Sequence, residues 1–312
     1  METRKRRSER LSEKNITPKK KKKYRGLKIF GLIVLLVLLI GGAIFGKAYF
    51  DVKNVMVKSY QTIDRKTTAK LPSLKEKSSF SFLFLGVNDK TANDILVLTV
   101  NPKKNKTTVI SLNRNIYLPS ESTTLKELYG SKGAAGEIDA LQTLLGVDIP
   151  RYMTFDMRGL GDFVEVVGGV QVQNDTHFVS SGFEFKPGTL ILKKADEVKA
   201  YLTKVGDDAD KAEADLIDRE QTVLIAIIPK MKSANAVVNY KKFVNAFGVN
   251  VKTDFVFGNI KALGLNYNGV LGNITKENLK PVETTIDGKT QKILSEALVN
   301  KAHDRIETAL NE

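Results

Sequence analysis

Residues 93–119 read NDILVLTVNPKKNKTTVISLNRNIYLP. They contain two runs of β-branched and large apolar residues, Ile95–Val100 and Thr107–Leu112, with the sequence Asn101–Lys106 between them. Val, Ile and Thr favour strands, whereas Asn and Pro favour turns. The stretch therefore predicts a β-hairpin whose two strands are largely buried.

Strand-like and helix-like segments alternate on both sides of this hairpin. Phe80–Leu85 is a run of aromatic and large apolar residues that Gly86 closes, so it predicts another strand. Residues 136–145 carry apolar side chains at helical spacing, and Gly146 ends that helix. The same reasoning gives strands at 152–155, from 170 and around 282–292, and helices at 160–167, 194–202, 215–228 and 293–310. This order predicts an α/β (α+β) domain with a mixed central β-sheet flanked by helices.

The N-terminal part predicts a membrane anchor. Residues 29–45 carry no charge, and the stretch to residue 49 is long enough to cross a hydrocarbon core of ~30 Å. Lys and Arg are concentrated in residues 1–28, so this tail should stay in the cytoplasm. We expect a cytoplasmic basic tail (1–28), a transmembrane helix (29–49), an extracellular stalk (50–77) and an extracellular domain (78–312). A cleaved signal peptide is the alternative, although the apolar run exceeds the usual 7–15 residues.

The high net charge is mainly a property of the tail. The chain carries a net charge of +14, and residues 1–28 contribute ten of those charges, with thirteen basic and three acidic side chains. The remaining surplus of about four does not indicate a nucleic-acid partner. The basic cluster Lys19–Lys23 lies beside the predicted anchor and suits either simple orientation or attraction to anionic lipid headgroups.

The chain has no cysteine and only two histidines, His177 and His303. A disulfide scaffold, a thiolate nucleophile and a multi-histidine metal centre are therefore excluded. Any chemistry must use carboxylates, arginine, lysine and hydroxyl groups.

Several motifs occur in a characteristic order. After the anchor come FLFLGVND (82–89), the hairpin stretch, LLGVDIPRY (144–152), FVEVVGGVQV (163–172), FKPGTLIL (185–192), VKAYL (198–202) and DLIDREQTVL (215–224). This ordered set resembles the LytR–CpsA–Psr (LCP) family of Gram-positive envelope proteins, with a motif core at 80–231. The resemblance implies transfer of a glycopolymer from a polyprenyl-pyrophosphate carrier to peptidoglycan, with Mg²⁺ or Mn²⁺ as cofactor. It also implies an apolar channel for the prenyl chain.

The resemblance also implies the site residues. It places Arg114 and Asp94 in catalysis, and Arg114, Arg219, Gln221 and Lys204 around the pyrophosphate. Asp94 and Asn88 would hold the metal ion. Each residue also has a structural interpretation: Arg114 as a surface cation, Asp94 as the brace of a turn, and Arg219 as an ion-pair partner on its helix.

The sequence departs from the family pattern at several of these positions. Asn88 stands where an aspartate is usual, although Asp89 follows it, and Asn115 stands where an acid is usual. Arginines usual in the family are replaced by Ala92, Thr203, Val205 and Leu216. Lysine cannot fully substitute for them, because it lacks the bidentate fork of a guanidinium.

Two functions follow from this balance of matches and departures. The first is an active, membrane-anchored transferase of cell-wall assembly. The second is a catalytically impaired homologue that binds lipid-linked polymer or peptidoglycan and acts as a regulator or partner of active relatives. In either case the resemblance predicts that Asp94, Arg114 and Arg219 meet at one end of the sheet.

Overall fold

The computed structural model describes residues 49–312 except 52, 67–68, 70–71, 204, 231–237, 268 and 271–272. Residues 50–312 form one compact unit. The predicted tail and all of the predicted membrane helix except Tyr49 lie outside the described residues. Within the described part, no helix combines the length and the apolar composition that a membrane crossing requires.

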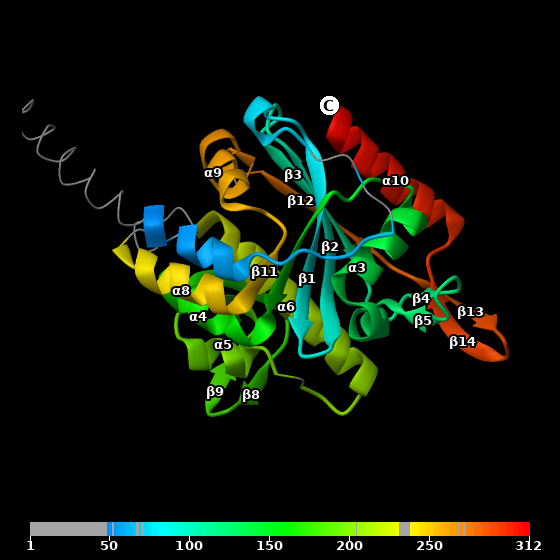
Figure 1. Cartoon of the computed structure of the whole chain (residues 1–312). Helices are drawn as coiled ribbons and strands as arrows, with labels where there is room; N and C mark the ends of the chain where they lie inside the picture. The colour runs from blue at the N-terminus through cyan, green and yellow to red at the C-terminus, as the bar shows by residue number, and fades with distance from the viewer. Residues whose placement is uncertain are drawn as a thin grey trace, which may run out of the picture. The chain divides into compact units, whose positions relative to one another are not determined.

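A six-stranded mixed sheet forms the centre of this unit (Figure 1), in the order β11-β6-β1-β2-β3-β12. β1, β2 and β3 pair antiparallel, whereas β6 pairs with β1 and β12 pairs with β3 in parallel. The predicted mixed sheet is therefore confirmed. The strands are β1 (Phe80–Asn88), β2 (Thr91–Asn101), β3 (Lys106–Leu112), β6 (Arg151–Asp156), β11 (Val251–Thr253) and β12 (Ile274–Leu279).

The predicted hairpin is β2 and β3. Its register runs from Ile95 opposite Leu112 to Asn101 opposite Lys106. On its other side β2 pairs with β1, and the register shifts between Gly86 and Val87. A β-bulge of this kind bends the strand and re-aims nearby side chains.

Helices cover both faces of the sheet (Figure 1). One face is covered by α3 (Leu125–Leu145) and α10 (Glu296–Asn311). The core on the other face includes side chains of α4 (Leu160–Val166), α5 (Ala195–Tyr201), α6 (Ala209–Lys230) and α8 (Tyr240–Asn250). α9 (Phe257–Asn266) packs against a short 3-10 helix at Leu74–Glu76. Four two-stranded ribbons complete the unit: β4 (Tyr117–Leu118) with β5 (Thr123–Thr124), β7 (Val170–Asn174) with β10 (Gly188–Leu192), β8 (Phe178–Ser180) with β9 (Phe183–Phe185), and β13 (Val282–Ile286) with β14 (Lys289–Ile293).

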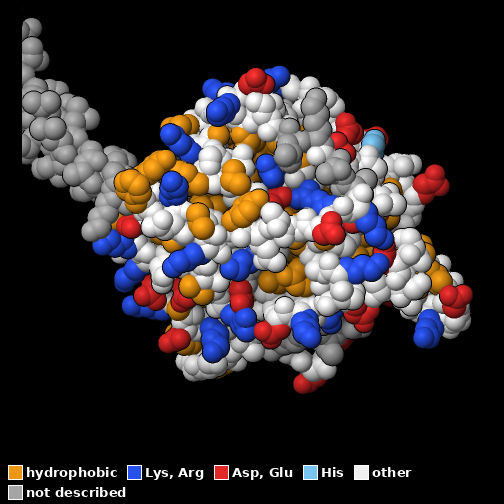
Figure 2. Space-filling view, viewed as in Figure 1, with side chains coloured by type: hydrophobic (Ala, Val, Ile, Leu, Met, Phe, Trp, Pro, Cys, Tyr) orange, Lys and Arg blue, Asp and Glu red, His pale blue; other side chains and the backbone are white. Residues whose placement is uncertain are grey.

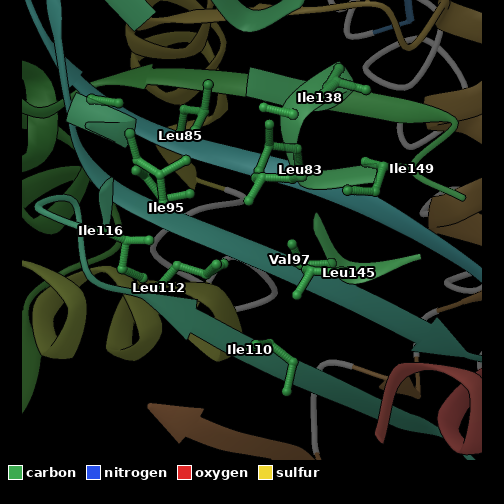
Figure 3. Close-up of a cluster of buried hydrophobic side chains, with 14 of the residues drawn as sticks. Leu83, Leu85, Ile95, Val97, Ile110, Leu112, Ile116, Ile138, Leu145 and Ile149 are labelled. Carbon is green, nitrogen blue, oxygen red and sulfur yellow. The ribbon is translucent and has the colours of Figure 1, made fainter. Parts of the chain in front are cut away.

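The sheet separates two apolar cores. Successive side chains of a strand point to opposite faces. Leu83 and Leu85 therefore join the core under α3 and α10, together with Ile138 of α3 (Figure 3). Phe84 and Leu96 join the second core, under α4, α5 and α6. Because both faces are covered, the central strands read as nearly continuous apolar runs rather than alternating ones.

α3 begins earlier than the sequence predicts. The expected helix covers 136–145, whereas the observed one starts at Leu125 after a capping box formed by Thr124 and Glu127. Gly133 breaks the helix locally with φ 62° and ψ −160°, a conformation that is essentially restricted to glycine. The glycines in this half obscure the helical pattern, but the capping-box spacing is a signal for the earlier start.

The segment predicted as a stalk contacts the rest of the unit at several points. Residues 53–59 are helical, and Tyr60 forms a β-bridge with Thr253 on β11. Arg65 forms an ion pair with Asp254, and Leu74 is buried in a small aromatic cluster beside α9. The described part of 50–77 is thereby fastened to the edge of the sheet.

Candidate functional site

Asp94 lies on β2 opposite Gly86 of β1, and its side chain is completely buried. A Cβ atom at position 86 would lie 2.7 Å from Asp94 Oδ2 and 2.7 Å from the sulfur of Met157. Such distances are shorter than van der Waals contact, so only glycine at position 86 leaves room for this carboxyl group.

α6 brings a second carboxyl group, that of Glu220, against Asp94. Glu220 is 5% exposed, and Oε2 of Glu220 and both carboxylate oxygens of Asp94 have no hydrogen-bond partner. We call these two groups the carboxyl pair. Burial and the neighbouring Glu220 raise the pKa of Asp94 well above its ordinary value. Burial also raises the pKa of Glu220 to about 7, although Asp94, Arg114 and Arg219 act in the opposite direction.

Two further polar side chains surround the carboxyl pair. Ser111 of β3 donates a hydrogen bond of 3.1 Å to Oε1 of Gln221, which joins α6 to the sheet, and the Gln221 amide lowers the pKa of Asp94. Lys276 of β12 is half-buried, and its charge also lowers the pKa of Asp94. Burial in turn lowers the pKa of Lys276, against the influence of Asp218 and Asp94.

Arg114 follows the end of β3 and is 6% exposed. Its Nη1 donates to Oδ1 of Asn93, which is the extra residue of the bulge on β2, and its charge lowers the pKa of Glu220. The carbonyl of Arg114 accepts a 2.9 Å hydrogen bond from the backbone N–H of Lys126 in the first turn of α3. The backbone of Arg114 is therefore tied to the start of α3, and its guanidinium is bonded to β2.

Arg219 precedes Glu220 on α6, and its guanidinium is anchored to the protein backbone. Nε donates to the carbonyl of Tyr201 at 3.0 Å and Nη2 to that of Thr203 at 2.7 Å. The guanidinium carbon lies 4.9 Å from the centroid of the Phe178 ring, a cation–π arrangement. These contacts tie α6 to the end of α5 and to β8.

The structure places the predicted site residues differently. Asp94, Arg114 and Gln221 come together around Glu220, while Arg219 adjoins the group with its guanidinium bonded to carbonyls. Asn88 is half-buried at the end of β1, where it pairs with Thr91. Lys204 lies outside the described residues.

Two cavities of the described structure lie away from these residues. One, of about 400 Å³, is lined by residues of α3, β6, β11 and the segment before β1, including Tyr129, Tyr152 and Lys252. The other, of about 510 Å³, lies between α4 and α8. Neither cavity is lined by Asp94, Arg114 or Arg219. Among the described residues, no group of three or more His, Asp or Glu side chains is arranged to hold a metal ion.

Sequence reasoning missed Glu220 and Lys276. A signal for Glu220 was present, because helical spacing places it on the apolar stripe of α6, four residues from both Leu216 and Leu224. An acid in such a stripe is buried, and buried acids are paired or functional. Lys276 carried no comparable signal, because β12 itself was not predicted.

Comparison with known proteins gives the family. Residues 47–308 match the profile of the LytR_cpsA_psr family. The chain belongs to this family. A LytR_cpsA_psr relative from Enterococcus faecalis, the polyisoprenyl-teichoic acid–peptidoglycan teichoic acid transferase TagU, is 28% identical over 302 residues, which cover 92% of this chain and 99% of the relative. The TagU protein of Bacillus subtilis is 27% identical over 86% of this chain and 90% of its own length.

A solved structure is also similar. Protein gbs0355 of Streptococcus agalactiae superposes with a TM-score of 0.67 and 26% identity, covering 78% of this chain and 92% of that protein. The resemblance first seen in the ordered motifs is therefore confirmed, and so is the LCP-like fold of the central sheet and its helices.

Proposed function

We propose that this chain is a membrane-anchored extracellular protein of cell-wall assembly, which transfers a glycopolymer from a polyprenyl-pyrophosphate carrier to peptidoglycan. Its membership of the LytR_cpsA_psr family and the names of its TagU relatives support a role as a cell-wall glycopolymer transferase. The observation that carries the proposal is the convergence of Asp94, Arg114 and Gln221, from three separate elements, at one end of the sheet.

The chemistry of these residues suits a pyrophosphate leaving group. Transfer from such a donor requires stabilisation of the negative charge that develops on the departing phosphate. Arg114 supplies a fixed guanidinium, and Lys276 adds a second cation that partly replaces the missing family arginines. Asp94 fits a divalent cation, because both of its buried oxygens lack a hydrogen-bond partner. Mg²⁺ or Mn²⁺, when bound, would neutralise charge on the phosphates.

Topology completes this proposal. A basic tail at 1–28 and an apolar helix at 29–49 would hold the unit at the outer face of the membrane, where a lipid-linked donor is found. Peptidoglycan would then lie on the same side as the site. On the face seen in Figure 2, basic and acidic side chains are interspersed and do not form the continuous basic patch that a nucleic-acid-binding protein presents.

A transfer assay tests the proposal. Full-length protein in detergent is mixed with Mg²⁺ or Mn²⁺, peptidoglycan and a polyprenyl-pyrophosphate glycan, and polymer attached to peptidoglycan is measured. We expect turnover, and Arg114→Ala should reduce it at least about tenfold, since charge stabilisation in the transition state is lost. Arg305→Ala on α10 is the matched control on the opposite face and should turn over normally. Failure with every lipid-linked donor, while the E. faecalis relative is active, would reject the transferase.

A second function has its own observations. The Arg219 guanidinium is bonded to two carbonyls, and Ala92, at a position where the family usually has arginine, is completely buried in the core under α3. These features favour a protein that binds lipid-linked polymer or peptidoglycan without turnover and acts as a partner or regulator of active relatives.

The same assay separates the two functions. For the binder, we expect retention of the lipid-linked glycan without release of product, and gain of turnover in the double variant Asn88→Asp, Thr203→Arg. Ala92→Arg is left out of this variant because it would place a guanidinium in the apolar core. Turnover by the unaltered chain at the rate of the E. faecalis relative rules the binder out.

A further inference from the structure

We propose that Glu220 is the second carboxylate of a divalent-cation site, which it forms with Asp94 in place of the acid that Asn88 has replaced. The role of the cation in catalysis rests on the proposed function. Binding of the cation does not, because it depends on the carboxyl pair alone.

The first argument is the state of the carboxylate oxygens. Asp94 is completely buried and Glu220 is 5% exposed, yet three of their four oxygens have no hydrogen-bond partner of ordinary geometry, with only each other and the Gln221 amide nearby. Buried polar groups in native proteins are nearly always satisfied, and an exception requires an explanation such as a missing ion. Two neighbouring carboxylates with unpartnered oxygens are the donor set that Mg²⁺ and Mn²⁺ prefer.

The second argument is the way in which the fold creates the pair. Asp94 lies near the start of the central strand β2, and Gly86 leaves the space that its carboxyl group occupies. Glu220 approaches from α6, which Arg219 and Gln221 fix to α5 and to Ser111 of β3. Both carboxyl groups are therefore held by rigid elements, as a preorganised ligand set requires.

The third argument is charge. Asn88 can offer only a neutral oxygen, so Asp94 would otherwise be the single charged ligand, and Glu220 restores the second charge. The pair has a charge of −2 when ionised, and two like charges held together in a buried site repel each other. A divalent cation would neutralise the pair, so that the positive charges of Arg114 and Lys276 would no longer be offset by it and would favour an anionic substrate.

Binding of Mn²⁺ alone tests the site, with full-length protein in detergent and no lipid-linked donor. Bound and unbound Mn²⁺ are distinguished by electron paramagnetic resonance, and the affinity is checked by calorimetry. We expect one Mn²⁺ per chain, and a loss of affinity of at least about tenfold in Glu220→Gln, since even residues that only support metal ligands have effects of this size. Asp94→Asn should have at least as large an effect.

Glu137→Gln is the matched control. Glu137 is also completely buried with both oxygens unpartnered, but it lies on α3 in the opposite core. Its replacement should leave the Mn²⁺ affinity unchanged. If Glu220→Gln binds Mn²⁺ as tightly as the unaltered chain does, or if the unaltered chain binds none, the pair is held by a shared proton and the inference is wrong.

The outcome is separable from that of the transfer assay. If Mn²⁺ binding depends on Glu220 but no polymer is transferred, the proposed cation site stands and the proposed transferase function is wrong. If the protein transfers polymer but Glu220→Gln binds Mn²⁺ as tightly as the unaltered chain, the proposed transferase function stands and the proposed cation site is wrong.

Discussion

At the scale of single residues, Glu137 shows what a buried acid does to stability. Its carboxyl group is completely buried on α3 and has no hydrogen-bond partner of ordinary geometry, although the backbone of Tyr129 lies close enough to stabilise its charge weakly. Burial raises its pKa well above the ordinary value of 4.5, and the backbone of Tyr129 opposes this only partly. The folded chain therefore holds a proton more tightly than the unfolded chain does, so folding becomes less favourable as the pH rises above about 4.5.

Replacing this acid should stabilise the protein at neutral pH. We expect Glu137→Gln to raise the free energy of unfolding by about 1–3 kcal/mol at pH 7.5, because an ionisable group no longer has to be buried. The gain should shrink as the pH falls toward 4.5. Urea unfolding at several pH values measures it, with Glu283→Gln on exposed β13 as the control that changes little. An equal gain at all pH values would mean that packing, not ionisation, is responsible.

At the scale of elements, the attachment of α6 depends on Arg219. Its guanidinium donates hydrogen bonds to the carbonyl of Tyr201 at the end of α5 and to the carbonyl of Thr203 just after it. It also lies over the Phe178 ring. Lysine lacks the planar guanidinium group, so it can neither donate to two carbonyls from one rigid group nor stack on an aromatic ring in the same way. Arg219→Lys should therefore lower the free energy of unfolding by about 1–3 kcal/mol.

An exposed arginine provides the comparison. Arg158, which pairs with Asp156 and Asp89 on the surface, should tolerate the same change to lysine with little effect on stability. Chemical denaturation of both variants measures the difference, and pyrophosphate-lipid binding is followed in parallel. Normal stability with lost binding in Arg219→Lys would identify Arg219 as a ligand rather than a brace.

The elements differ in how well the sequence predicts them. β3, α4 and α5 have strong apolar patterns, and their predicted bounds lie within one residue of the observed ones. β2 and α6 are also predicted, but β2 begins four residues earlier and α6 six residues earlier than their apolar patterns indicate. β11 has only three residues, and β12 reads ITKENL with one fully buried side chain. Such short, weakly apolar strands form because a neighbouring strand is available to pair with them, and the residue pattern within the strand itself does not indicate that neighbour.

The same contrast applies to the candidate site. The motifs predicted Asp94, Arg114 and Gln221, which the structure places together, and their roles stay predictions. Glu220 was missed although its position in the apolar stripe of α6 indicated burial. Lys276 could not be found, because its place beside Asp94 depends on the pairing of β12 with β3.

At the scale of the whole molecule, the charge distribution makes a prediction about orientation. We expect protease added to intact cells to remove the chain beyond about residue 50 and to leave the basic tail, because dense Lys and Arg resist translocation. Immunoblotting of tags at the two ends measures this. An N-terminal tag that is cleaved in intact cells would show that the orientation is reversed.

The strand order of the sheet also has a consequence for how the chain is made. β1, β2 and β3 are synthesised first and occupy the middle of the sheet, whereas the edges, β11 and β12, come from residues 251–253 and 274–279. A nascent chain therefore exposes two unpaired strand edges until most of its length has emerged. Such edges template association with other chains. A chain that ends before residue 251 lacks both β11 and β12, so β6 and β3 would present open edges, and we expect such a chain to associate with other chains more readily than the complete one.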